Sequence, residues 1–208
     1  SETVWRQADK FGVPRVCFVN KLDRTGADFF AAYESILKRL TSRAHPIMLP
    51  IGAESAFEGV VDLLAEESVR FEGPHGERAV RGPVPEGMRS EVAEWRTKLV
   101  EAIAETDDAL TEKFLHGEAI SVAELRSALR RATRTGTVVP VLCGSALRNQ
   151  GVQLVLDAVV DYLPSPVDLP PVAGTDPRDL GKTLERQRIQ EEPFAALAFK
   201  IQTDPFVG

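Results

Sequence analysis

The sequence contains the same local pattern twice: a compact apolar run, a polar turn, and an amphipathic helical stretch. The first copy runs from "VPRVCFV", residues 13–19, through "NKLDRTGA" to a helical stretch over residues 28–40. The second runs from residues 138–143 through "GSALRNQG" to an apolar stripe over residues 152–163. Apolar β-branched runs bounded by turns are typical of strands buried on both faces of a parallel sheet. The chain is therefore expected to have an α/β fold with a doubly wound parallel sheet.

Composition limits the class of protein. With 208 residues and 43% hydrophobic content, the chain is long enough to bury a substantial core. It contains no apolar run long enough to span a membrane and no signal-peptide pattern at "SETVWRQADK". The two cysteines, Cys17 and Cys143, lie in apolar segments, which favours buried reduced thiols over a disulfide. We expect a soluble cytoplasmic monomer with no membrane partner, and the net charge of −6 argues against a nucleic-acid clamp.

The middle of the chain interrupts the α/β pattern. Two strand-like stretches flank the "GPHG" turn at residues 73–76, as in an antiparallel hairpin. Three helical stretches follow, and the third begins with the capping box Ser121-x-x-Glu124. We therefore predict an inserted α+β subdomain over residues 59–136. The predicted parallel-sheet domain would then consist of residues 1–58 and 137–163.

The C-terminal part of the chain has a different composition. Residues 164–192 are rich in Pro, Gly and charge, which predicts an extended linker without a packed element. Apolar residues then alternate from Ala195 to Ile201, which is strand periodicity. A lone strand has no partner in the sequence, so we expect residues 193–208 to form a strand and the chain to be a fragment.

The two polar turns follow strands of one parallel sheet, where α/β proteins bind their ligands. A guanine base presents a carbonyl acceptor and two neighbouring N–H donors. Ionised Asp23 accepts only, so it suits both donors at once. Asn20 can tie the two turns together, and the aliphatic stem of Lys21 can lie along the base. The small Ser145 and Ala146 allow backbone N–H groups to approach the base carbonyl. The pair of turns therefore predicts a guanine-binding site.

Other motifs in the sequence are rejected. The pattern D-x-x-G at Asp23 to Gly26 shares its aspartate with N-K-x-D, and one aspartate cannot serve both the base and the phosphate end of a site. The "LGKT" at residues 180–183 lacks the first glycine of a phosphate-binding loop and follows a Pro-rich segment instead of a strand. No Cys or His pair has metal-ligand spacing, so we predict no metal site within these 208 residues.

Three segments in this order resemble bacterial translation elongation factor G. They are "SETVWRQADKFGVPRVCFVNKLDRTGADF", "GSALRNQGVQLVLDAVVDYLPSP" and "EPFAALAFKIQTDPFVG". The resemblance covers nearly the whole chain. It implies the later part of a P-loop GTPase domain with its inserted subdomain, followed by the first strand of a barrel domain. It also implies a ribosomal translocase that couples GTP hydrolysis to movement of tRNA and mRNA.

The resemblance also implies a set of ligands and partners. The residues that would bind the base of GTP or GDP are Asn20, Lys21, Asp23, Ser145, Ala146 and Leu147. The ligands of Mg²⁺ would lie outside this chain, together with the phosphate-binding loop, the switch regions and the catalytic histidine, so the fragment alone is expected to be inactive. The inserted subdomain would face the stalk proteins of the large ribosomal subunit. Alternatives are a ribosomal-protection or release-factor GTPase and a non-catalytic module that docks on the ribosomal stalk.

Overall fold

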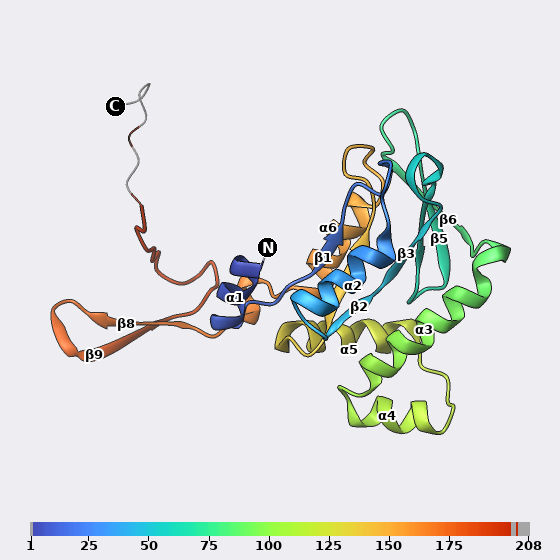
Figure 1. The fold of residues 1–208 in the computed structure, drawn as a ribbon. Helices are drawn as coiled ribbons and strands as arrows, with labels where there is room; N and C mark the ends of the chain where they lie inside the picture. Colours follow the sequence, from blue (N-terminus) through green and yellow to red (C-terminus); the bar gives the residue numbers. More distant parts are fainter. Residues whose placement is uncertain (1, 201–202, 204–208) are drawn as a thin grey trace. The chain divides into compact units, whose positions relative to one another are not determined.

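The computed structural model describes residues 2–200 and 203. The chain divides into two compact units, Ser1–Leu163 and Pro164–Gly208 (Figure 1). Within residues 2–200, no helix combines the length and apolar content that a membrane crossing needs.

A three-stranded parallel sheet forms the centre of the first unit. Its order is β1 (Cys17–Val19), β7 (Val139–Cys143), β2 (Ala44–Pro46). Helix α2 (Phe29–Arg39) lies on one face of this sheet and α6 (Val152–Tyr162) on the other (Figure 1). All five residues of β7 are buried, as expected for a strand between two helical layers. The predicted α/β fold with a parallel sheet is confirmed.

Local capping sets the ends of these helices. Asp28 caps α2, and its side chain accepts from the Ala31 N–H at 3.0 Å. Helix α1 (Glu2–Lys10) ends before Gly12, which has a φ of 60°.

A four-stranded antiparallel sheet lies beside the parallel one. Its strands, in order, are β3 (Met48–Ile51), β4 (Gly59–Asp62), β5 (Glu67–Glu72) and β6 (Arg78–Pro83). The expected hairpin around residues 73–76 is present as the connection between β5 and β6.

The segment "HPIMLPIGA" belongs to both sheets. Strand β2 ends at Pro46 and β3 begins at Met48, so a single residue separates them. The N–H of Ile47 donates to Val141 O at 2.9 Å, and its carbonyl accepts from Leu63 N at 3.0 Å. Ile47 therefore joins β7 of the parallel sheet to the end of β4 in the antiparallel sheet.

Three helices gather at one end of the two sheets (Figure 1). They are α3 (Arg89–Ala104), α4 (Asp108–Leu115) and α5 (Val122–Thr135). The predicted capping box is present at the start of α5, where Ser121 and Glu124 bond each other's backbone N–H groups. Short 3₁₀ turns lie between β3 and β4 at η1 (Glu54–Ala56) and directly before α3 at η2 (Glu86–Met88).

One hydrophobic core serves the parallel sheet, the antiparallel sheet and the three helices. Leu49 of β3, Leu99 of α3, Leu125 of α5 and Val141 of β7 all belong to it and are at most 1% exposed. The predicted boundary between residues 58 and 59 falls between β3 and β4, which are hydrogen-bonded neighbours. The inserted region therefore shares its packing with the parallel sheet.

The second unit differs from the linker that composition predicts. After η3 (Pro166–Asp168), strands β8 (Val172–Asp176) and β9 (Asp179–Arg186) pair as an antiparallel hairpin. Asp176 closes the turn, because its side chain accepts from Arg178 N at 2.9 Å. Residues 193–200 of the expected barrel strand form neither helix nor strand, and most of its remainder lies outside the described residues.

Candidate functional site

Both polar turns follow the carboxyl ends of neighbouring strands. Val19 of β1 lies opposite Cys143 of β7 in the parallel ladder. The N–H of Gly144 donates to Val19 O at 3.0 Å, and the N–H of Leu22 donates to Gly144 O at 3.2 Å. The structure thus brings together two turns that are more than a hundred residues apart in the sequence, at the edge of the sheet where α/β proteins bind ligands.

Asn20 connects the two turns through its side chain. Its Oδ1 accepts from the N–H of Lys21 at 2.7 Å and from the N–H of Ala146 at 2.9 Å. Both partners are donors, so the oxygen of the amide must face them. The N–H of Ala146, which the sequence assigned to the base carbonyl, therefore already has an acceptor.

The first turn is anchored by Leu22, which is 3% exposed, while Lys21 beside it is exposed. Lys21 has a φ of 65°, a left-handed conformation that is uncommon outside glycine. This conformation lets one residue point to solvent and the next into the core. The aliphatic stem of Lys21 is thus free to lie along a ligand.

Asp23 is nearly enclosed by the second turn. Its side chain is only 9% exposed, and its Oδ2 lies 3.3 Å from Arg148 Nε. The Ser145 hydroxyl donates to the carboxylate and, with help from the Asp23 N–H and Arg148, holds the pKa of Asp23 below its usual value. Asp23 is therefore an ionised acceptor at neutral pH.

The second turn is a tight backbone loop. Ser145 and Gln150 exchange two backbone hydrogen bonds of 2.9 Å each, and Ser145 is fully buried. A Cβ on Gly144 would lie 2.3 Å from Gln150 O, so only glycine fits there. Ala146 and Leu147 are exposed at the tip of the turn, with Leu147 at 82%. A ligand beside Asp23 would therefore meet the backbone of this turn together with the side chains of Leu147 and Arg148.

Glu54 supports the first turn from the antiparallel sheet, and the sequence did not indicate it. Its N–H donates to Leu22 O at 2.8 Å, and its Oε1 accepts from Gly26 N at 2.7 Å. The glycine of the rejected D-x-x-G pattern is thus held by Glu54. No local signal in "GAES" marks this role, because the contact spans 28 residues.

The tip of the β5–β6 hairpin supports the second turn. Gln153 Nε2 donates to Gly76 O at 2.8 Å. A Cβ on Gly76, which has a φ of 61°, would lie 2.6 Å from Arg148 O. The inserted region therefore contacts the second turn of the candidate site, while the first turn is supported by Glu54, which precedes that region. Arg148 was also missed from the sequence, because its partner Asp23 lies more than a hundred residues away along the chain.

The rejected "LGKT" lies within strand β9 and not in a strand-to-helix loop. Among residues 2–200 and 203, no three His, Cys, Asp or Glu side chains lie close enough to hold a metal ion.

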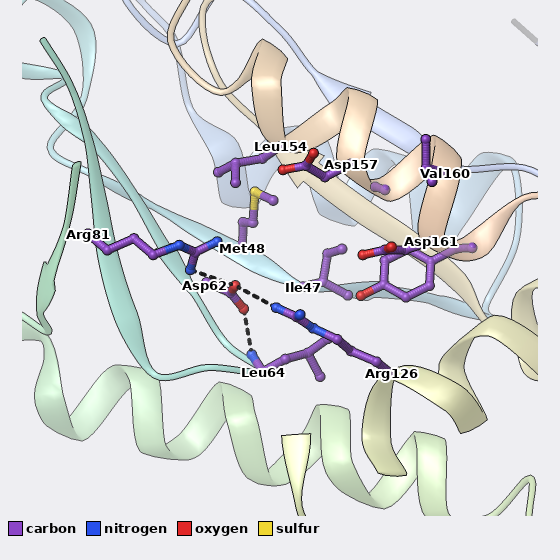
Figure 2. A pocket seen from close by; sticks show the side chains of 12 residues that line it. Ile47, Met48, Asp62, Leu64, Arg81, Arg126, Leu154, Asp157, Val160 and Asp161 are labelled. Carbon is purple, nitrogen blue, oxygen red and sulfur yellow. Dashed lines mark hydrogen bonds and ion pairs between the residues drawn. The ribbon is translucent and has the colours of Figure 1, made fainter. Parts of the chain in front are cut away.

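A separate cavity of about 260 Å³ lies between α6, α5 and the antiparallel sheet (Figure 2). Asp62 on its wall accepts from Leu64 N at 2.9 Å and lies 3.5 Å from Arg81 and 3.8 Å from Arg126. Its lining contains none of the six predicted site residues. The ion pairs of Asp62 with Arg81 and Arg126 join β4, β6 and α5.

Comparison with known proteins gives two findings. Residues 1–165 match the protein family described as the elongation factor Tu GTP binding domain. The chain is also similar to the crystal structure of ttk003000868 from Thermus thermophilus, with 33% sequence identity and a TM-score of 0.71. That similarity covers 82% of this chain and 26% of the other, so this chain spans well under half the length of that protein.

Proposed function

The chain belongs to the elongation factor Tu GTP binding domain family, a family of translational GTPases that bind guanine nucleotide, and from this premise we propose that its two joined turns bind the guanine base. The residues assigned to the base are Asn20, Lys21, Asp23, Ser145, Ala146 and Leu147. The observation that carries the proposal is the Asn20 bridge, which holds the turn containing Asp23 against the turn containing Ser145.

Asp23 gives the site its selectivity for guanine. The guanine edge has two adjacent N–H donors, and a carboxylate accepts both. Adenine presents a ring-nitrogen acceptor and a C–H there, so its acceptor would face the carboxylate without a proton between them. An unpaired, nearly enclosed carboxylate costs about 1–3 kcal/mol, enough to disfavour adenine strongly. The low pKa of Asp23 keeps the carboxylate ionised for this task.

The remaining residues shape the pocket. Ser145 holds the carboxylate in place, and the stem of Lys21 covers one face of the base. The exposed Leu147 lies at the tip of the second turn and would cover part of the ligand. To donate to the base carbonyl, the N–H of Ala146 would break its hydrogen bond to Asn20 Oδ1 or share it between the two acceptors.

We assign the whole protein to the elongation factor G type of translational GTPase, which promotes ribosomal translocation. The motifs "RTGADF" and "TDPFVG" favour this type over a ribosomal-protection or release-factor GTPase. GTP hydrolysis would require the phosphate-binding loop and Mg²⁺ ligands, which we place outside these 208 residues. The protein would act in the cytoplasm as a monomer, with residues 59–136 facing the stalk proteins of the large ribosomal subunit. A stalk-docking module without catalysis is the second candidate.

Asp23→Asn in the full-length protein tests the guanine assignment. The new amide can donate to the extra carbonyl of xanthine, so affinity should move from GDP toward XDP, with GDP binding weakened about 10-fold or more. Competition binding with GDP, XDP and ADP measures the change. Asp28→Asn is the matched control, because the asparagine can still cap α2. Unchanged GDP preference in Asp23→Asn would refute the role of Asp23.

A further inference from the structure

The turn that carries Asp23 is held on both flanks by one residue of the antiparallel sheet. That residue is Glu54, in the connection between β3 and β4. Its N–H donates to Leu22 O at 2.8 Å, directly before Asp23. Its Oε1 accepts from Gly26 N at 2.7 Å, shortly after Asp23. The position of Asp23 along the turn is therefore bracketed by two hydrogen bonds to Glu54.

The backbone of Glu54 has a conformation that glycine would adopt more readily. Its φ is 54°, in the left-handed region that a Cβ disfavours. The connection is tightly folded around it, since a Cβ on Gly52 would lie 2.0 Å from Ala56 O. Strained residues of this kind persist where their contacts over-determine them, and they gather at functional sites. The strain at Glu54 thus points to a role for its side chain.

We propose that Glu54 is a positioning residue that presets Asp23 for the guanine edge. The inference rests on the proposed guanine site and adds a residue that acts on the base only through the backbone of the turn. Without the carboxylate, Leu22 still anchors the start of the turn, but Gly26 loses its acceptor. Guanine would then have to order the turn as it binds, and this ordering weakens affinity.

The effect should be confined to ligands that bond to Asp23. GDP presents two N–H donors to the carboxylate, whereas ADP presents none at that edge. Loosening the turn should therefore lower the affinity for GDP and leave the weaker affinity for ADP nearly unchanged. A loss of overall stability would instead weaken the binding of both nucleotides.

The test is competition binding of GDP and ADP to the full-length protein with Glu54→Ala and Glu54→Gln. Alanine removes the acceptor, so the ratio of GDP to ADP affinity should fall about 3- to 10-fold, the range of one hydrogen bond. Glutamine keeps an acceptor oxygen, so its ratio should stay within about two-fold of the wild type. A glutamine variant as weak as the alanine variant would overturn the role of the acceptor.

Glu54→Gly separates positioning from stability. Glycine relieves the positive φ but also lacks the carboxylate, so its urea midpoint should lie at or above that of Glu54→Ala. Its ratio of GDP to ADP affinity should nevertheless fall as far as in the alanine variant. Wild-type affinity for GDP in Glu54→Gly would overturn the proposal, because affinity would then follow the backbone and not the side chain.

Glu58→Ala is the matched control. Glu58 lies in the same connection, but its side chain is 62% exposed and pairs with Arg70 at 3.6 Å. Its removal should leave the affinity for GDP unchanged, and an equal loss in Glu58→Ala and Glu54→Ala would contradict the proposal. A wild-type protein without preference for GDP over ADP refutes the guanine site itself. A preference that survives intact in Glu54→Ala refutes only the positioning role.

Discussion

Replacing Asn20 with alanine tests the bridge between the two turns independently of any nucleotide. The change removes one oxygen that accepts two backbone hydrogen bonds, from Lys21 at 2.7 Å and from Ala146 at 2.9 Å. Asn20→Asp is the matched variant, because a carboxylate oxygen can accept both bonds. The pair of variants therefore separates the loss of the acceptor from the loss of the amide.

The expected magnitude follows from the two bonds. Each hydrogen bond contributes about 0.5–1.5 kcal/mol net, which gives about 1–3 kcal/mol for both. Asn20 and its partners are exposed, so water replaces part of the lost bonding and the lower half of this range applies. We expect Asn20→Ala to lower the free energy of unfolding of the first unit by about 1–2 kcal/mol. Asn20→Asp should stay within about 0.5 kcal/mol of the wild type.

Urea unfolding followed by tryptophan fluorescence measures this difference. Both tryptophans, Trp5 and Trp95, lie in the unit Ser1–Leu163, so the signal reports on that unit alone. With a typical slope of about 2 kcal/mol per M, the midpoint of Asn20→Ala should fall by about 0.5–1 M. Equal midpoints for both variants, whether unchanged or lowered alike, would show that the oxygen does not bridge the turns.

Two further predictions concern the supports of the site and of α5. Gly76→Ala should lower the unfolding free energy by about 1–2 kcal/mol, because its φ of 61° disfavours alanine and the new Cβ would meet Arg148 O. Gly87→Ala is the control, since a Cβ there meets no neighbour. Equal melting temperatures for the two variants would contradict the contact between Gly76 and Arg148. The pKa of Glu124 is lowered from 4.5 to about 2 by Lys113 and Ser121. Its contribution to stability is thus complete above pH 4.5 and is lost as pH falls toward 2. Melting temperatures of the wild type and Glu124→Gln should therefore converge over that interval, and a constant difference would contradict the assignment.

Much of the fold could be predicted from local sequence because its signals are local. Asp28 and Ser121 mark helix starts by capping their own backbone, and the buried run of β7 is readable from its apolar residues. The meeting of the two turns follows from parallel strand order, since neighbouring carboxyl ends lie at one edge. The Asn20 bridge was expected for the same reason.

The rest depends on contacts between distant residues. Glu54 holds Gly26, and Gly76 packs on Arg148, across gaps that no periodicity reveals. The second-unit hairpin was missed because Pro and Gly in residues 164–192 suggested a linker, while the turn closed by Asp176 pairs its two strands. The division of one apolar run into β2 and β3 likewise depends on partners elsewhere in the chain.

The single residue between β2 and β3 has a mechanical consequence. An insertion attached through loops can swivel, but Ile47 is hydrogen-bonded on one side to Val141 and on the other to Leu63. The antiparallel sheet is thus attached without a hinge. A force applied to that sheet is transmitted as tension along β2 and into β7, whose end carries Gly144 and Ser145. Transplanting the insertion into another GTPase would therefore mean rebuilding a strand of the recipient's central sheet.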